Sequence, residues 1–218
     1  MTEFPRITPF GESALLVELG ATIEPALNAR VHVLADRLDQ GVDGLPGLGR
    51  CVPAYASLLV PFEPGSVDVS DLVERLGELA TRAEGEAVSG SLVEIAVMYG
   101  YDDGPDLEEV ARLTGISADA VIDQHAAAEY RVYMLGFAPG FAYLGPLPET
   151  LRLPRRAEPR VRVPAGSVAV AGAQTAVYPQ QTAGGWHLIG RTDERLWDPS
   201  AHEPARLRPG DRVRFVPA

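Results

Sequence analysis

Residues 130–192 decide the fold of this chain. They carry three motifs in order, YRVYMLGFAPGFAYLG at 130–145, PRRAEPRVRVPAGSVAVAGAQTAVYP at 154–179 and GGWHLIGRT at 184–192. Eight glycines and seven prolines fall between Tyr133 and Thr192. Disordered segments share this density but have few aromatic and β-branched residues, whereas this stretch has many of both. The pattern therefore predicts short apolar strands joined by tight turns, with glycine where the backbone makes a close approach.

The polar residues of this stretch predict a concave, mostly apolar pocket with a few converging polar groups. A buried amide needs hydrogen-bond partners, and both the backbone and a ligand remain open as partners of Gln174. Trp186 follows two glycines and is expected to fill a barrel, with a pocket wall as the alternative. Arg191 pairs either with a ligand anion or across a barrel rim. Alternation along an extended segment would place Arg160 and Arg162 on one face.

Charge is divided unevenly along the 218 residues, whose net charge is −11. Residues 1–124 carry 22 acidic side chains and 7 arginines, whereas residues 125–218 carry 8 acidic side chains and 12 arginines. This asymmetry predicts two domains with different partners, which we place at 1–88 and 89–218 with a linker around 83–91. The acidic half argues against nucleic-acid binding, which needs a basic surface.

The residue types exclude several chemistries. The chain has no lysine, so a Schiff base and a P-loop lysine are excluded, and phosphate would be held by arginine, backbone N–H groups or a partner. The four histidines lack metal-ligand spacing, so no metal site is predicted. The single Cys51 excludes an internal disulfide and fits a reducing cytosol. The sequence MTEFPR lacks secretion features, and no apolar run approaches the ~20 residues of a spanning helix. We expect a soluble cytoplasmic protein without a membrane partner.

The first half predicts a small α+β sandwich. Its expected elements are hairpin strands at 7–10 and 14–19, a helix over 23–38, strands at 50–52 and 57–62, and a helix from Val69 capped by Asp68 or Ser70. The order strand-strand-helix-strand-strand-helix favours a sandwich of split-βαβ type.

The second half predicts a strand, two short helices and then an all-β segment. The strand covers Leu92–Met98, and Pro105 is expected in the first turn of the first helix. The acidic residues between 102 and 109 match a helix N-terminus better than a calcium loop. His125 ends the second helix, either as a proton-transfer group or as a residue favoured there by the helix dipole. From Tyr130 to a terminal strand at Asp211–Val216, many short strands favour a barrel or sandwich.

The three motifs, together with VPAYASLLV at 52–60, resemble the KipI / allophanate hydrolase subunit 1 family, which includes the B-subunit of bacterial 5-oxoprolinase. The resemblance extends over nearly the whole chain. It implies an α+β N-terminal domain and a cyclophilin-like β-barrel C-terminal domain. It also implies an enzyme subunit that is inactive alone. With a KipA / allophanate hydrolase subunit 2-like partner, this subunit would phosphorylate 5-oxoproline, using ATP and magnesium shared with the partner, and a third subunit would open the ring.

The resemblance also marks residues. The family pattern covers His125, Tyr133, Gly136, Phe137, Pro139, Gly140, Phe141, Pro164, Gly166, Gln174, Thr175, Gly185, Trp186 and Arg191. We expect catalytic roles for His125 and Gln174, and substrate contacts from Tyr133, Phe137, Phe141, Arg156, Gly166, Gln174, Gly185, Trp186 and Arg191. In this hypothesis Arg156 and Arg191 stabilise charge, backbone N–H groups contact an oxyanion, and His125 or Gln174 orients the substrate. The chain departs from the family pattern at Ala142, Pro146, Ala183 and His187, which leaves the substrate open.

Two alternatives belong to other classes. KipI-like proteins inhibit a sensor histidine kinase, and under that interpretation the barrel is a docking surface and the pocket motifs are structural. A carboxyl-transfer module related to allophanate or urea metabolism is the third interpretation, although such modules usually need a biotin carrier and this chain has no such motif.

Overall fold

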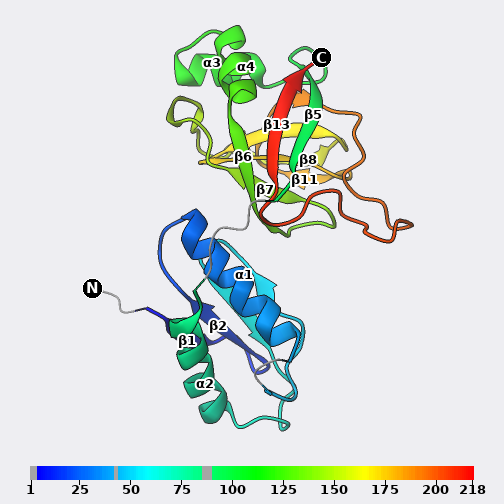
Figure 1. The fold of residues 1–218 in the computed structure, drawn as a ribbon. Helices are drawn as coiled ribbons and strands as arrows, with labels where there is room; N and C mark the ends of the chain where they lie inside the picture. The colour runs from blue at the N-terminus through cyan, green and yellow to red at the C-terminus, as the bar shows by residue number, and fades with distance from the viewer. Residues whose placement is uncertain (1–3, 42–43, 85–89) are drawn as a thin grey trace. The chain divides into compact units, whose positions relative to one another are not determined.

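The computed structural model describes residues 4–41, 44–84 and 90–218. The chain forms two compact units, Met1–Val88 and Ser89–Ala218 (Figure 1). The predicted linker around 83–91 lies mostly outside the described residues. In the described ranges, no helix has the length and apolar character needed to cross a bilayer.

The N-terminal unit is an antiparallel sheet with two helices. Its elements are β1 (Arg6–Pro9), β2 (Ala14–Glu18), α1 (Pro25–Asp39), β3 (Val52–Pro53), β4 (Ser57–Pro61) and α2 (Val69–Arg82). The strands are ordered β1-β2-β4-β3, so β2 and β3 run in the same direction on either side of β4. The predicted hairpin and both helices are confirmed, whereas the name split-βαβ stays a prediction.

Alternation along the strands explains how this unit is layered. Leu15 and Val17 of β2 share a buried cluster with Leu58 and Val60 of β4 and with the apolar stripes of both helices. Because successive side chains of a strand point to opposite faces, both helices cover the same face of the sheet. Asp68 caps α2, since its side chain accepts hydrogen bonds from the backbone N–H groups of the next turn.

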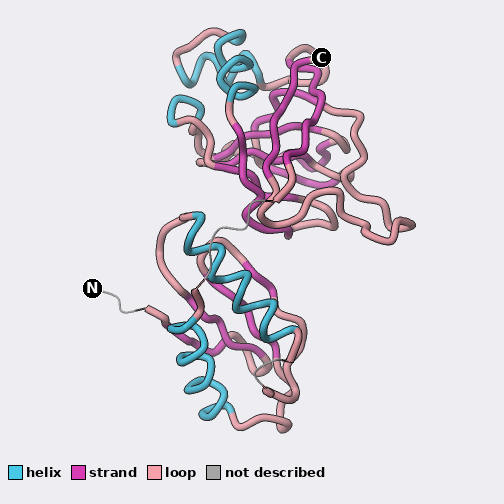
Figure 2. The backbone as a smooth tube through the Cα atoms, viewed as in Figure 1, coloured by secondary structure: helices cyan, strands magenta, loops and turns pink. Residues whose placement is uncertain are grey.

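The C-terminal unit is a closed barrel (Figure 2). Its strands run in the order β10-β7-β6-β13-β5-β12-β9, and a separate ribbon pairs β11 with β8. The elements are β5 (Leu92–Tyr99), α3 (Leu107–Thr114), α4 (Ala118–Ala127), β6 (Glu129–Leu135), β7 (Ala142–Gly145), the 3₁₀ turn η1 (Glu149–Leu151), β8 (Arg160–Val163), β9 (Ser167–Ala171), β10 (Gln174–Val177), β11 (Thr182–Gly184), β12 (His187–Arg191) and β13 (Arg212–Pro217).

The barrel closes through partners that are distant in sequence. Figure 1 shows β13 beside β5, and these two strands pair in parallel although β5 opens the unit and β13 ends it. Helices α3 and α4 lie at one end of the barrel (Figure 1), and the Ser117 side chain caps α4 by accepting a hydrogen bond from the N–H of Ala120. Pro105, expected in the first turn of α3, lies just before that helix, which begins at Leu107. The predicted barrel is confirmed, whereas the name cyclophilin-like stays a prediction.

Candidate functional site

The barrel wall formed by β7, β9, β10 and β12 has two chemically different faces. In β9, Val168 and Val170 belong to the cluster that fills the barrel interior. Ala169 and Ala171, which alternate with them, belong to a second cluster that also holds the β8 residue Val163. This second cluster therefore lies on the outer face of the wall, under the β8–β11 ribbon. The small alanine side chains leave room there for aromatic rings.

A pocket of about 190 Å³ opens on this outer face. Its lining consists of Phe137, Phe141, Tyr143, Arg155, Arg156, Pro159, Tyr178, Gly184, Gly185 and Trp186. Phe141 is the centre of the aromatic group, with its ring centroid 5.0 Å from that of Tyr143, 5.3 Å from Tyr178 and 5.8 Å from Trp186, all edge to face. Such geometry holds the rings rigidly and leaves a flat-walled hollow. The expectation that Trp186 fills the barrel interior is wrong, because its ring belongs to the outer cluster.

Phe137 stands at this pocket in a strained turn. Its φ is +68°, and the N–H of Ala138 donates to the carbonyl of Gly136 at 2.8 Å, which makes Phe137 the central residue of a γ-turn. A non-glycine residue in the left-handed region costs about 1–2 kcal/mol. The side chain is 61% exposed, although its ring contacts Phe141 at a centroid distance of 5.2 Å. Strain that supports an exposed ring beside a pocket is typical of functional positions.

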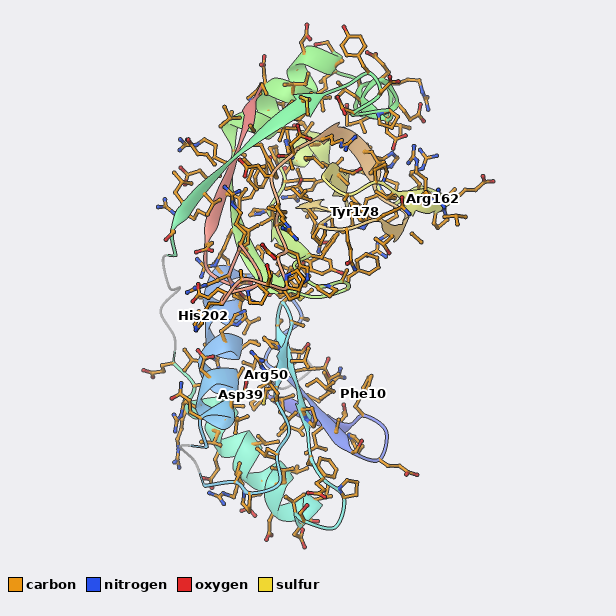
Figure 3. The ribbon with its side chains drawn as sticks, turned by 90° about the vertical axis from the view of Figure 1, so that its right-hand side faces the viewer. Phe10, Asp39, Arg50, Arg162, Tyr178 and His202 are labelled. Carbon is orange, nitrogen blue, oxygen red and sulfur yellow. The ribbon has the colours of Figure 1, made fainter. Side chains whose placement is uncertain are left out.

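Tyr178 brings a hydroxyl group to the pocket wall. A Cβ atom at position 184 would overlap this hydroxyl, so glycine is required there. The backbone N–H of Trp186 lies near the Tyr178 oxygen and acts to lower the pKa of the phenol. Burial nevertheless raises the pKa of Tyr178, despite this N–H group and the nearby positive charge of Arg155. Figure 3 shows Tyr178 within the barrel unit and Arg162 at its outer edge.

Asp106 organises the arginines beside the pocket. It is 4% exposed and accepts hydrogen bonds from Arg156 at 2.9 Å, from Arg160 at 2.7 and 2.8 Å, and from the N–H of Leu188 at 2.7 Å. Burial acts to raise the pKa of Asp106, but hydrogen bonds from Arg160 and Leu188 and the charges of both arginines bring it below its usual value. The prediction that these acids mark a helix N-terminus is confirmed, because Asp106 is the N-cap residue of α3 and Glu108 and Glu109 lie in its first turn. Asp106 precedes α3, yet its side chain makes no capping bond there and instead ties α3 to β12 and the arginine segment.

Arg155 differs from its neighbour Arg156. It lines the aromatic pocket but makes no hydrogen bond or ion pair with any side chain that the structure describes. It also lines an adjoining hollow of about 450 Å³, which shares Arg156 and extends to Glu109 and His187. An unpaired guanidinium group between an aromatic pocket and a polar hollow is well suited to a carboxylate or a phosphate.

His125, predicted to act in catalysis, lies on the other side of the wall. It is 0% exposed, its ring stacks on Phe215, and its Nδ1 and Nε2 atoms lie 2.7 Å from the Tyr99 hydroxyl and 2.9 Å from the Thr175 hydroxyl. Burial lowers the pKa of His125 to about 3. The ring is therefore neutral at physiological pH, and it lines none of the hollows described above. The dipole interpretation is also wrong, because a helix C-terminus stabilises a charged imidazole.

The remaining predicted residues are divided by the structure. Phe137, Phe141, Arg156, Gly185 and Trp186 come together at the pocket.

Four predicted contacts do not line it. Gln174 is the first residue of β10 and, like Ala176 two positions later, it points to the outer face of the barrel wall. It does not belong to the residues that line the pocket. Tyr133 is buried in β6. Gly166 allows a close approach to the carbonyl of Thr192, and Arg191 lies 4.0 Å from Asp103. Gly166 and Arg191 lie near the C-terminal end of β12, whereas His187 is at its N-terminal end.

Sequence reasoning missed Tyr178, Arg155 and Asp106 as members of the site. Tyr178 directly follows β10. Because side chains two positions apart in a strand lie on the same face, Tyr178 was predictable on the outer face together with Ala176. No local signal marked Asp106, because its partners lie about 50 and 80 positions further along the chain.

The N-terminal unit has a larger hollow, of about 290 Å³, beside the start of α2. Its acidic lining includes Asp68, whose carboxylate is already engaged in capping the helix. Cys51, buried in the same unit, has its pKa raised to about 12 by burial and by the Asp39 carboxylate, so it is a packing residue rather than a nucleophile. The outer pocket of the barrel is therefore the candidate site.

Comparison with known proteins points to one family. Residues 5–207 match the model of the carboxyltransferase domain, subdomain C and D. The chain is 42% identical to the B-subunit of 5-oxoprolinase from Bacillus subtilis, over 99% of this chain and 94% of that protein. It is 45% identical to the B-subunit of 5-oxoprolinase from Escherichia coli O157:H7, over 95% of this chain and 93% of that protein.

Solved structures agree with this assignment. The crystal structure of TTHA0988 has a TM-score of 0.82 and 41% identity, and it covers 94% of this chain, which spans only 39% of that longer chain. The urea amidolyase of Kluyveromyces lactis has a TM-score of 0.84 over 97% of this chain and 15% of its own, but at 19% identity it shows the fold alone. The chain belongs to the carboxyltransferase-domain family, subdomains C and D, within the group of 5-oxoprolinase B-subunits.

Proposed function

We propose that this chain is a subunit of an ATP-dependent 5-oxoprolinase and that the outer pocket holds 5-oxoproline. Family membership supports the reaction, and one structural observation supports the place. That observation is an aromatic pocket of about 190 Å³ with the guanidinium group of Arg155 at its wall, which pairs with no side chain in the described part of the chain. A flat lactam ring fits between aromatic walls, and its carboxylate needs a cationic partner.

The site residues have different roles in this proposal. Phe137, Phe141 and Trp186 enclose the ring and exclude water, and Arg155 binds the carboxylate. Arg156, held by Asp106, adds fixed positive charge at the border with the adjoining hollow. His125 and Gln174 position the wall behind the pocket and transfer no proton.

ATP with magnesium would act together with a KipA-like partner, and the subunit alone would be inactive. The donors that Arg155 and Arg156 present to the adjoining hollow of about 450 Å³ suit phosphate oxygens. When bound, ATP supplies the phosphoryl group that makes an unreactive amide hydrolysable. A third subunit then opens the ring.

Reconstitution tests the proposal. The chain, its KipA-like partner and the ring-opening subunit are mixed, and glutamate release is measured with and without ATP and 5-oxoproline. We expect turnover only in the complete mixture, and Arg155→Gln should reduce kcat/KM about 100-fold because the charge-assisted carboxylate contact is lost. Arg162→Gln, on the exposed ribbon, is the matched control with unchanged kinetics. Full activity of Arg155→Gln would exclude this pocket. Inhibition of a sensor kinase without any turnover would favour the regulatory alternative.

A further inference from the structure

The Tyr178 hydroxyl group is held in place at the pocket wall by the packing around it. The phenol is 2% exposed, and its ring is held edge to face by Phe141 and Phe137 at centroid distances of 5.3 and 6.4 Å. The backbone N–H of Trp186 lies near its oxygen and acts to lower the pKa of the phenol. Glycine at position 184 leaves space for the hydroxyl. The ring packing and the absence of a side chain at position 184 therefore determine where this oxygen lies, at the pocket wall.

The proton of this hydroxyl remains available to a ligand. Among the residues that the structure describes, no group accepts the hydroxyl proton, so the group can act as a donor to a ligand. Burial raises the pKa of Tyr178, so the phenol keeps its proton at neutral pH. Arg155 lies close enough for its charge to act on both Tyr178 and Tyr143. The guanidinium group is also a donor only, so two donors face the same pocket.

We propose that the Tyr178 hydroxyl and the Arg155 guanidinium together bind the carboxylate of the ligand, so that the pocket selects an ionised carboxylate over a neutral carboxamide. This inference rests on the proposed function and names the groups that determine its specificity. A carboxylate offers only acceptors and satisfies both donors. A carboxamide has the same shape but presents an NH₂ group, which leaves a donor facing a donor in a desolvated place.

The test compares 5-oxoproline with its carboxamide in the complete three-subunit complex. The affinity for 5-oxoproline is measured as KM, and the affinity for the carboxamide as its competitive inhibition constant. In Tyr178→Phe the ring and its packing remain and only the hydroxyl is lost. We expect KM for 5-oxoproline to rise about tenfold and the inhibition constant of the carboxamide to change less than about twofold, because a hydrogen bond to a charged group is worth more than one to a neutral group. Tyr101→Phe, in an exposed turn, is the matched control and should change neither constant.

Each outcome has a separate meaning. A structural role of the hydroxyl would weaken both ligands by the same factor, because loss of the Trp186 contact disturbs the wall for any occupant, and that result would overturn the inference. An unchanged KM in Tyr178→Phe would also overturn it while leaving the proposed function intact, provided that Arg155→Gln loses activity. Failure of the wild-type complex to turn over 5-oxoproline would remove the proposed function, and the inference with it.

Discussion

The two faces of the barrel wall differ in whether their polar side chains have hydrogen-bond partners within the protein. On the inner face, His125 is fully buried and both ring nitrogens have partners, in Tyr99 and Thr175. On the outer face, Tyr178 and Arg155 keep donors that no described side chain satisfies. The same strands supply both faces, with valines on one side of β9 and alanines on the other. A polar group whose partners are all internal contributes to stability, whereas one left without a partner is available to a ligand.

The largest expected loss of stability comes from a substitution on the inner face of the barrel wall. His125→Ala removes the ring stacked on Phe215 and leaves buried hydroxyl groups without a partner, so the free energy of unfolding should fall by about 4 kcal/mol. Urea unfolding followed by tryptophan fluorescence reports on the barrel, because both tryptophans, Trp186 and Trp197, lie in this unit. The matched control His202→Ala, at an exposed position, should stay within about 0.5 kcal/mol of wild type. Equal stability of the two variants would contradict a structural role for His125.

The pH dependence of the same variant sharpens the contrast. The pKa of His125 is about 3 in the folded chain and 6.5 when unperturbed, so the unfolded state gains a proton as pH falls below 6.5 while the folded state does not. Its contribution to stability is therefore complete above pH 6.5 and decreases toward pH 3, by up to about 1.4 kcal/mol per pH unit. His125→Ala should lack this slope. Parallel pH profiles for variant and wild type would mean that the imidazole is accessible to protons.

Asp106→Asn tests the link between the helices and the outer face. Removing the charge leaves Arg156 and Arg160 half-buried without a counter-ion, so we expect a loss of about 3 kcal/mol at pH 7. The pKa of Asp106 is lowered in the folded chain, so its contribution is complete above the unperturbed value of 3.8 and is lost as pH falls through the folded value. The two curves of stability against pH should converge in acid. Asp102→Asn, in the exposed turn that precedes Asp106, is the control. If Asp102→Asn lowered stability as much as Asp106→Asn, the hydrogen bonds of Asp106 to Arg156 and Arg160 would not be the cause of the loss.

Gly184→Ala should have a smaller effect, confined to the outer face. The added methyl group overlaps the Tyr178 hydroxyl, and displacing the buried phenol costs about 2 kcal/mol. Weaker binding of 5-oxoproline should accompany this loss. At the next position, Gly185→Ala meets its nearest atom at 3.6 Å, an ordinary contact, and should be nearly neutral in stability. Two variants with the same melting temperature would show that Tyr178 has room to move.

Phe137→Gly is expected to have the smallest effect on stability. This variant should weaken substrate binding without lowering stability. Glycine accepts a φ of +68° without strain, and the lost ring was 61% exposed, so stability should stay level or rise by up to about 1 kcal/mol. The KM for 5-oxoproline should nonetheless rise about tenfold. Phe10→Gly removes a ring that is 58% exposed at a residue without positive φ, so it should lower stability by up to about 1 kcal/mol, as thermal melting would show. Loss of stability in Phe137→Gly would mean that its ring belongs to the core.

Local patterns in the sequence were sufficient for most of the secondary structure. The caps Asp68 and Ser117, the β1–β2 hairpin and the strand β5 follow from signals within a few residues of each element. The aromatic motif around Phe137 and Phe141 indicated a pocket because its glycines and aromatic residues are adjacent in the chain. His125 was misjudged for the same reason, since its surroundings in sequence describe a helix end and say nothing of Phe215 or Thr175.

The sequence by itself determined the two units' composition, the periodicities of helices and strands, and the exclusion of lysine chemistry, because these depend only on residue types and short spacings. Only the tertiary structure decided that the site lies on the outside of the barrel wall. That choice depends on which face of each strand meets the closed interior and on Asp106 reaching Arg156, Arg160 and Leu188 across about 50 to 80 positions of chain. Pairings over such separations are set by the packing of the whole barrel, so no short stretch of sequence records them.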